Sequence, residues 1–368
     1  MTLESLFDDK VGATVDIRLE RNGEPIDRGI IVADLHALTP DEYIEFGDSV
    51  VHDLSYQQAW HFNRPREGVF IAAPGYVFRA AGIPRKSLIV EVEGAPIRNL
   101  DDMERALGQL ADRENAAVRY VTIEQPSQTK LRIIRMDRRW FRTARCTSDA
   151  ASGLWPCRAL DKGREAEPRQ PATVQFAKTD DQQLRRISRS LVLVNFDMPY
   201  TISGVSDRHY YGTGLVVDAE RGFVVVDRNT VPEAMGDARI TFAGSLEIPA
   251  RVEFVHPLHN LTLLSYDPAL IGDTPVEAAR LNVTEPRPGE ELRVVGLGPS
   301  GRLASQAARV ASIDPLALPL SRTMRFRDTN LEVISLVNSP RNFDGVLLDS
   351  RGGVIGLWSS FAFETGKE

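Results

Sequence analysis

Several features that define other protein classes are scarce or missing in this chain. Its 368 residues include only two cysteines, Cys146 and Cys157, too few for a fold built on disulfides. No histidine or third cysteine accompanies them at a zinc-site spacing, so we expect no metal and no cofactor. The two could pair in an oxidising compartment, but the prediction is two reduced thiols in a linker.

Long apolar runs are missing as well. No stretch approaches the about 18 consecutive apolar residues of a membrane-spanning helix. Residues 1–10 contain neither the apolar centre nor the small-residue cleavage site of a secretory signal. Taken at face value, the sequence predicts an intracellular protein with no membrane partner. The abrupt start before a domain is also what a fragment of a longer protein would show.

The chain also has no excess of positive charge. The formal net charge of −7 provides no overall attraction to nucleic acid or to anionic membranes. One local run, Lys130 to Arg145, contains seven Lys or Arg and a single acidic residue, Asp137. No nucleic-acid motif accompanies it, so a solvated strand face running into a linker is the better interpretation. We expect no nucleic-acid partner.

The N-terminal part alternates polar and apolar residues, which indicates half-buried strands. Residues 11–20 show this period of two, and an Asn-Gly type turn at 21–24 predicts that residues 27–33 return as the hairpin partner. Farther on, Asn99 has the position of an N-cap, followed by an apolar stripe at helical spacing. That stripe consists of Leu100, Met103, Leu107 and Leu110, and the predicted strands around it are 68–73, 88–94, 117–123 and 130–136.

The chain divides into three parts by composition. Residues 147–186 are rich in Gly, Pro, Gln and alternating charge, which is typical of a connection that buries no core. From Ser190 onward, short apolar strands follow one another at near-regular spacing with almost no helical period, which favours closed antiparallel barrels. We therefore predict a mainly β protein with a first domain at 1–145, a linker at 146–186 and a barrel domain at 187–368.

Three segments of the last domain carry a family resemblance. They are Gly-Thr-Gly-Leu-Val-Val-Asp (212–218) with Asp-Arg-Asn-Thr-Val (227–231), His-Pro-Leu-His-Asn-Leu (256–261), and Asn-Phe-Asp-Gly-Val-Leu-Leu-Asp (342–349). In order and spacing they resemble the trypsin-like protease domain of the HtrA/Deg serine proteases. That resemblance implies a double β-barrel with an active site between the barrels.

The catalytic positions of that family are occupied by other residue types here. The histidine, aspartate and serine positions correspond to Asn229, Asn260 and Phe343. An asparagine amide does not titrate near neutral pH, and a phenylalanine has no nucleophilic atom, so a Ser-His-Asp mechanism cannot run on these side chains. We therefore predict a protein that is not an enzyme, a pseudoprotease. The alternative is an active serine endopeptidase with a relocated or misaligned pair, such as Ser339 with His256 or His259.

The first domain resembles the PDZ domains of HtrA proteases, in the order strand, Ala-Gly turn, strand ending in Glu-Gly, and amphipathic helix. The resemblance implies a groove that takes peptides or protein C-termini as an added strand. Its carboxylate-binding loop would fall at Leu54, Ser55, Tyr56 and Gln57, where backbone N–H groups would form an anion nest. Met103 and Leu107 would line the groove, with a plain core role as the alternative.

Motifs such as Asp-Leu-His-Ala-Leu-Thr-Pro (34–40) and Leu-Ser-Tyr-Gln-Gln-Ala (54–59) resemble the branch of HtrA proteins with two protease-like halves. The resemblance implies a scaffold or regulatory role in protein quality control, with an active protease half as a partner. HtrA proteins form trimers through residues ahead of the Gly-rich turn. Here that segment is 191–200, with Phe196 and Tyr200, so a homo-oligomer is a further expectation.

Overall fold

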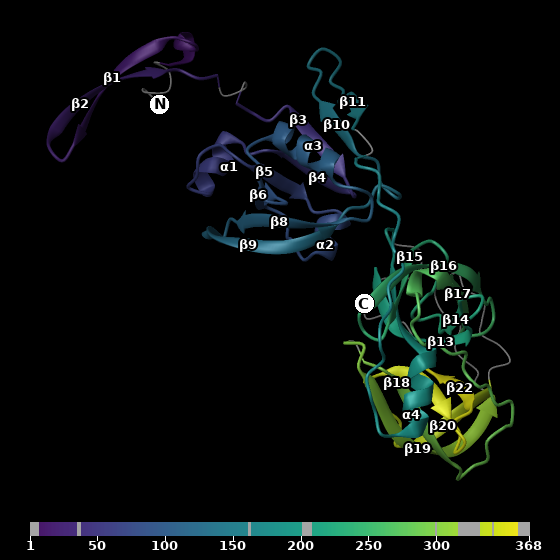
Figure 1. Ribbon diagram of the computed structural model, residues 1–368. Coiled ribbons are helices and arrows are strands. Elements are labelled where there is room, and N and C mark those ends of the chain that lie inside the picture. The colour runs from purple at the N-terminus through teal and green to yellow at the C-terminus, as the bar shows by residue number, and fades with distance from the viewer. Residues whose placement is uncertain are drawn as a thin grey trace. The chain divides into compact units, whose positions relative to one another are not determined.

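The computed structural model describes residues 7–34, 38–160, 163–200, 208–298, 300–315, 332–340 and 342–359. The chain forms two compact units, residues 1–167 and 168–368 (Figure 1). None of the helices formed by the described residues is both long and apolar enough to cross a membrane.

The first unit opens with a hairpin of β1 (Thr14–Arg21) and β2 (Glu24–Ile31), which form a two-stranded sheet of their own. The turn between them places Asn22 and Gly23 at φ of 53° and 83°. Asn and Gly adopt this left-handed region at low cost, which is why the Asn-Gly pair selects such a turn. The predicted hairpin is confirmed.

A nine-stranded antiparallel sheet forms the body of the first unit, in the order β11-β10-β3-β4-β5-β6-β8-β9, with β7 paired to β6. Its apolar core lies between this sheet and the helices. The strands are β3 (Glu42–Phe46), β4 (Ser49–Asp53), β5 (Val69–Ala73), β6 (Ser87–Val92), β7 (Ala95–Pro96), β8 (Asn115–Thr122), β9 (Gln125–Arg135), β10 (Ala144–Thr147) and β11 (Cys157–Ala159). The helices are η2 (Asp8–Lys10), α1 (Tyr56–His61), α2 (Val77–Ala80) and α3 (Leu100–Gln109).

Helix α3 begins where the sequence predicts. The side chain of Asn99 accepts a hydrogen bond from the backbone N–H of Asp102 at 2.9 Å, and so satisfies one of the free donors of the first turn. The apolar stripe of the helix is buried against the sheet, where Leu100, Met103 and Leu107 belong to the main core. The predicted N-cap and amphipathic helix are therefore confirmed.

The hairpin β10–β11 extends the sheet beyond β3. Because β10 pairs antiparallel with β11, Cys146 lies directly opposite Cys157, and the two form a disulfide with an S–S distance of 1.97 Å. The prediction of two reduced thiols is therefore wrong for this structure. The predicted linker 146–186 begins inside this hairpin and ends in α4 (Gln182–Ile187), so ordered elements occupy both of its ends.

The second unit contains a closed barrel with the strand order β12-β13-β14-β17-β16-β15. Apolar side chains from alternate positions of these strands fill its interior. The barrel consists of β12 (Leu191–Asp197), β13 (His209–Asp218), β14 (Phe223–Val226), β15 (Asp237–Phe242), β16 (Leu246–Val255) and β17 (Thr262–Tyr266), with α4, η3 (Ser188–Ser190) and η4 (Pro268–Ile271) outside it.

The remaining described strands form a five-stranded antiparallel sheet, β20-β19-β18-β21-β22. Its bounds are β18 (Glu291–Leu297), β19 (Leu303–Pro315), β20 (Glu332–Val337), β21 (Asp344–Leu348) and β22 (Val354–Trp358). A shared apolar cluster joins barrel and sheet through Leu215, Val295 and Val346. The predicted fold class is confirmed: the protein is mainly β, with a PDZ-like α+β domain followed by a β-barrel domain, whose described strands form one closed barrel and a five-stranded sheet.

The segment predicted to mediate self-association, residues 191–200, includes strand β12 of the barrel. Phe196 is fully buried in the barrel core, whereas Tyr200 is 42% exposed. Of these two aromatic side chains, only Tyr200 therefore reaches the surface of the unit.

Candidate functional site

The loop after β14 carries Asn229, the first of the three triad-equivalent positions. Asp227 shapes this loop: its Oδ1 accepts the backbone N–H groups of Asn229 at 2.8 Å and Thr230 at 3.0 Å. Its Oδ2 accepts the hydroxyl of Thr230 at 2.9 Å. Burial raises the pKa of the Asp227 carboxyl, and the hydrogen bonds from Thr230 and Asn229 oppose that rise.

Asn260 occupies the second position and connects three chain segments. Its Oδ1 accepts the backbone N–H of Arg228 at 3.0 Å, and its Nδ2 donates to Oγ of Ser359 at 3.1 Å. Ser359 directly follows β22. The amide therefore joins the loop after β14, the loop before β17 and the end of the second sheet.

Phe343, the third position, directly precedes β21. Its side chain is partly buried and packs against the apolar cluster of the second sheet. Gly345 on β21 pairs with Trp358 on β22, the residue before Ser359. The structure therefore brings the three predicted positions into one region of the second unit, connected through Arg228, Asn260 and Ser359.

A pair of carboxyl groups lies in the same region. Burial, together with the negative charge of Asp227, raises the pKa of Asp344 to about 6. The backbone beside it is fixed by Thr213 on β13, whose hydroxyl donates to the carbonyl oxygen of Asp344 at 2.7 Å and accepts the N–H of Leu297 at 2.9 Å. Thr213 thus ties the barrel to two adjacent strands of the second sheet, β18 and β21.

The histidines named for a relocated catalytic pair are held by local contacts. Nδ1 of His256 accepts the backbone N–H groups of Leu258 at 3.1 Å and His259 at 2.9 Å. The rings of His256 and His259 meet edge to face, with their centroids 4.4 Å apart. Within the described part of the chain, neither ring is hydrogen-bonded to a serine, Ser339 included.

One imidazole–carboxylate pair was missed by the sequence interpretation. Nδ1 of His209 lies 2.7 Å from Oδ1 of Asp197, and Oδ2 of the same carboxylate accepts Nη2 of Arg239 at 2.5 Å. The pair forms because β12 and β13 place Asp197 directly opposite His209. Only the pairing register of β12 with β13 would have revealed this pair, and the sequence does not specify that register.

In the first unit, the residues predicted to bind a carboxylate, 54–57, cover the connection between β4 and α1 and the first two residues of α1. Leu54 is buried, and its N–H donates to the carbonyl of Gly68 at 3.1 Å. Ser55 is the N-cap of α1: it receives the N–H of Gln58 at 3.1 Å and donates its own N–H to Oε1 of Gln58 at 3.1 Å. These contacts use two of the four N–H groups predicted for an anion nest, so the loop serves chiefly as a helix start.

Tyr56 and Gln57, the first two residues of α1, are exposed, whereas the two groove residues predicted on α3 are not. Met103 is 0% exposed and Leu107 is 1% exposed, and both pack in the main core. The predicted role of these two residues as groove lining is wrong for this structure. Helix α3 contacts β3, and its apolar stripe belongs to the main core, so the alternative core role is the one observed.

A cavity of about 370 Å³ lies on the other face of the sheet, beside two of the predicted residues, Ser55 and Gln57. Its walls combine aromatic and imidazole rings with polar groups. The lining residues are Thr39, Pro40, Glu42, Tyr43, Val50, His52, Ser55, Gln57, Gln58 and Trp155. Trp155 comes from the loop of the β10–β11 hairpin, and its ring centroid is 5.3 Å from that of Tyr43. Sequence reasoning missed Trp155 because the hairpin falls in the predicted linker.

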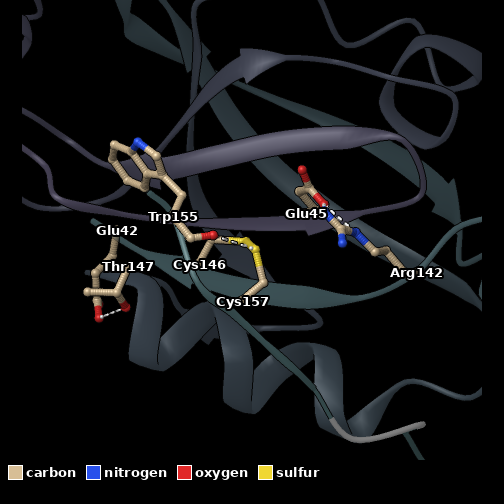
Figure 2. Close-up of a disulfide and its surroundings, with 7 residues drawn as sticks. All are labelled: Glu42, Glu45, Arg142, Cys146, Thr147, Trp155 and Cys157. Atoms are coloured by element: carbon tan, nitrogen blue, oxygen red, sulfur yellow. Dashed lines mark hydrogen bonds and ion pairs between the residues drawn. A yellow bond between two sulfur atoms is a disulfide. The ribbon is translucent and has the colours of Figure 1, made fainter. Parts of the chain in front are cut away.

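The outer edge of β3 is covered by β10, and polar pairs fasten the two strands together. Figure 2 shows the Cys146–Cys157 disulfide with Trp155 nearby, and the pairs Arg142–Glu45 and Thr147–Glu42. Arg142 Nε donates to Glu45 Oε2 at 2.7 Å, and the Thr147 hydroxyl donates to Glu42 Oε1 at 2.9 Å.

Comparison with known proteins shows which proteins this chain is similar to. The family described as "PDZ-like domain" matches residues 37–113. PDZ domain-containing protein C23G3.12c of Schizosaccharomyces pombe is 32% identical over 362 residues, which are 97% of this chain and 36% of that protein. Pro-apoptotic serine protease NMA111 of Saccharomyces cerevisiae is 30% identical over 99% of this chain and 37% of its own length. The nma111 protein of Aspergillus oryzae is 31% identical over 98% of this chain and 36% of its own length.

Two solved structures are also similar to parts of the chain. The HtrA-type protease AlgWS227A with tripeptide has a TM-score of 0.37 and 15% identity, over 50% of this chain and 55% of that one. Deg5 has a TM-score of 0.36 and 15% identity, over 48% of this chain and 81% of that one.

The chain contains a PDZ-like domain and is a homologue of proteins named serine proteases. Over nearly its whole length it is similar to the serine proteases named NMA111, and it spans a little over a third of their length. The prediction that it is not an enzyme is contradicted by these relatives, which match nearly the whole chain and are named serine proteases. The prediction was based on the three side chains at positions 229, 260 and 343, in a chain that spans a little over a third of those relatives.

Proposed function

We propose that this chain works as part of an HtrA-type serine endopeptidase, in which its PDZ-like domain binds substrate segments or protein C-termini. Partners of this kind are extended peptides, and the protease half of the same enzyme would receive what the domain binds. The observation that carries the proposal is the cavity beside β3 and β4, on a sheet of the type to which PDZ domains add a peptide strand.

The cavity has the chemistry to select a peptide side chain. Tyr43, His52 and Trp155 supply flat ring surfaces, which favour an apolar or aromatic group. Ser55 and Gln57 at one end supply polar atoms, which fix the orientation of a bound chain. A peptide that inserts one side chain here would therefore be recognised by ring contacts together with a few hydrogen bonds.

The barrel unit supports the same proposal through its connections. Asn260 and Thr213 each tie the barrel to the second sheet by side-chain hydrogen bonds. Such connections hold the two halves of a trypsin-like domain in one arrangement, as a cleft between barrels requires. Serine endopeptidase activity within this chain is the second candidate, supported by the names of the relatives that match it, although neither His256 nor His259 is hydrogen-bonded to a serine in the described residues.

Peptide binding can be tested with a displayed library of random C-terminal sequences, followed by titration of the selected peptides. Gln57→Ala is expected to weaken binding about 3- to 10-fold through the loss of a hydrogen bond. Trp60→Ala is the matched control: Trp60 lies on the same helix, is 79% exposed and does not line the cavity. Equal effects of the two variants would contradict the assignment of the cavity.

Endopeptidase activity can be tested with casein and fluorogenic peptides, together with labelling by an activated phosphonate. The assay is run on this chain and on the longer protein of which it is a homologue. A labelled serine in this chain would identify the relocated pair. The absence of hydrolysis and labelling in both proteins would overturn the endopeptidase proposal.

A further inference from the structure

A second cavity, of about 580 Å³, lies in the second unit, and none of the three triad-equivalent positions is among the described residues that line it. Four parts of the unit meet there: the segment 176–179, helix α4, the turn between β15 and β16, and the turn between β18 and β19. Its volume is within the range of about 300–1,000 Å³ that is usual for small-ligand sites.

The interior of the cavity is apolar because it continues the core that joins the barrel to the second sheet. Leu184 on α4, Leu297 at the end of β18 and Leu303 at the start of β19 are partly buried and pack against that core. Phe176 and Leu191 add further apolar surface to the lining. An apolar group that enters this cavity therefore leaves water for a hydrophobic surface.

Two glycine turns form one wall, one from the barrel and one from the second sheet. Gly244 and Gly301 line the cavity with φ of 69° and 71°, and a Cβ on Gly301 would lie 3.0 Å from Cα of Gly244. The two turns therefore approach each other backbone to backbone, which residues with side chains would not allow. A ligand in the cavity thus contacts the barrel and the second sheet at once.

The charged groups of the lining are all positive. They are Lys178, from the segment before α4, and Arg302, from the turn before β19, and no carboxylate is among the described lining residues. Both residues are exposed, which puts their charges at the mouth of the cavity. The cavity of the first unit, in contrast, includes Glu42. An apolar interior with a positively charged mouth suits a ligand that has an apolar body and one anionic end.

Backbone groups beside the cavity are already used. The N–H groups of Gly298 and Gly301 donate within their own turn, at 2.9 Å and 2.8 Å, and the carbonyl of Thr179 accepts Nη2 of Arg185 at 2.7 Å. A peptide would bring several amide groups, each of which loses its water in an apolar cavity and needs a new partner. A plain hydrocarbon body has no such groups, so it fits this lining better than a peptide does.

We propose that this cavity binds a hydrocarbon chain that ends in a single carboxylate, as in a medium-chain fatty acid. The chain lies on Leu184, Leu297 and Leu303, and the carboxylate lies at Lys178 and Arg302. Because the ligand contacts both the barrel and the second sheet, binding stabilises the packed arrangement of the two. This site is separate from the peptide-binding cavity of the first unit, and the inference does not depend on the proposed function.

The test titrates the full chain calorimetrically with dodecanoate below its micelle concentration. We expect one saturable site, a higher melting temperature of the second unit, and slower hydrogen exchange in α4 and in the turn between β18 and β19. Dodecanol, which has the same chain without the charge, is expected to bind about 10-fold more weakly. The peptide acetyl-Leu-Leu-Val with a free carboxylate is expected to bind more weakly than dodecanoate, because its amides find few partners.

Two variants locate the site, and circular dichroism checks that each remains folded. Lys178→Gln/Arg302→Gln is expected to weaken dodecanoate binding about 10-fold while leaving dodecanol binding unchanged. Ser300→Trp places a bulky ring at an exposed lining position and is expected to weaken both ligands. Arg280→Gln is the matched control, since Arg280 is an exposed arginine of the same unit that does not line the cavity.

Several results would overturn the inference. One is the absence of saturable dodecanoate binding, and another is equal affinity for dodecanoate and dodecanol. A tripeptide that binds more tightly than dodecanoate would show that the ligand class is wrong. Unchanged dodecanoate affinity in both the charge variant and Ser300→Trp would show that the fatty acid binds elsewhere.

Discussion

Asn260 accepts the backbone N–H of Arg228 through Oδ1 at 3.0 Å, across 32 residues of sequence. In a trypsin-like protease this position orients an imidazole. Here the amide has a different set of contacts, because its Nδ2 also donates to Ser359 at the end of the second sheet. The side chain at position 260 therefore holds loops together, and an amide suits that task because it both accepts and donates.

Replacement of Asn260 tests this role. Asn260→Ala leaves the N–H of Arg228 without its partner, and we expect a loss of about 1–2 kcal/mol in the free energy of unfolding. Urea denaturation measures it, and hydrogen exchange of residues 226–231 should accelerate. Asn260→Asp is the control, because it retains the acceptor and loses only the donation to Ser359. A larger loss in the aspartate variant than in the alanine variant would argue against this account.

Thr213 supplies a second test of the junction between barrel and sheet. Thr213→Val preserves the shape of the side chain but removes the hydroxyl that bonds to Leu297 and Asp344. Because Thr213 is buried, we expect a cost of about 1–3 kcal/mol. Thr213→Ser retains the hydroxyl and should cost less. Thermal unfolding of both variants decides the question, and equal melting temperatures would refute the proposed contribution of the hydroxyl.

The raised pKa of Asp344 predicts that the free energy of unfolding depends on pH. Its pKa of about 6 in the folded protein lies above the ordinary value of 3.8, so the folded state binds this proton more tightly than the unfolded state. The contribution of this group to stability is therefore fully present below about pH 4 and is lost as pH rises to 6. Asp344→Asn, which carries no charge, should be more stable than the unmodified protein at pH 7.

The gain in Asp344→Asn should be about 1–2 kcal/mol at pH 7, because solvent reaches part of the carboxyl and screens its charge. It should vanish near pH 4. Urea denaturation at pH 4, 5, 6 and 7 measures the difference. A difference that stays constant over this range would show that ionisation of Asp344 is not its cause.

Two glycines in the first unit, Gly75 and Gly82, share a positive φ but differ in the space around them. Gly75 has φ of 54°, and a Cβ there would lie 2.1 Å from backbone atoms of Asp48. Gly82 has φ of 69° with open space around it. Gly82→Ala should cost about 1 kcal/mol from the left-handed conformation alone, and Gly75→Ala several kcal/mol more, or prevent folding of the unit. Calorimetry of the two variants tests this, and similar costs would contradict it.

Local patterns in the sequence predicted the local structure well. The Asn22–Gly23 turn and the Asn99 cap are decided by residues close together in the chain, and both appear as expected. The repeating short strands likewise predicted barrels, because their period reflects burial on one face of a sheet. The predictions that failed concerned what each helix or strand packs against, which residue spacing does not specify. Met103 and Leu107 have the same spacing whether they line a groove or fill a core.

By itself, the sequence determined the mainly β class, the two kinds of domain and the family resemblance, because each depends on the order and spacing of residues. Only the tertiary structure decided that Cys146 faces Cys157, that Asp197 meets His209, and that β10 covers the edge of β3. Strand register sets these relationships, and a shift of one residue would turn each side chain to the opposite face of its sheet. No local pattern in the chain specifies that register, since it is chosen by packing across segments far apart in sequence.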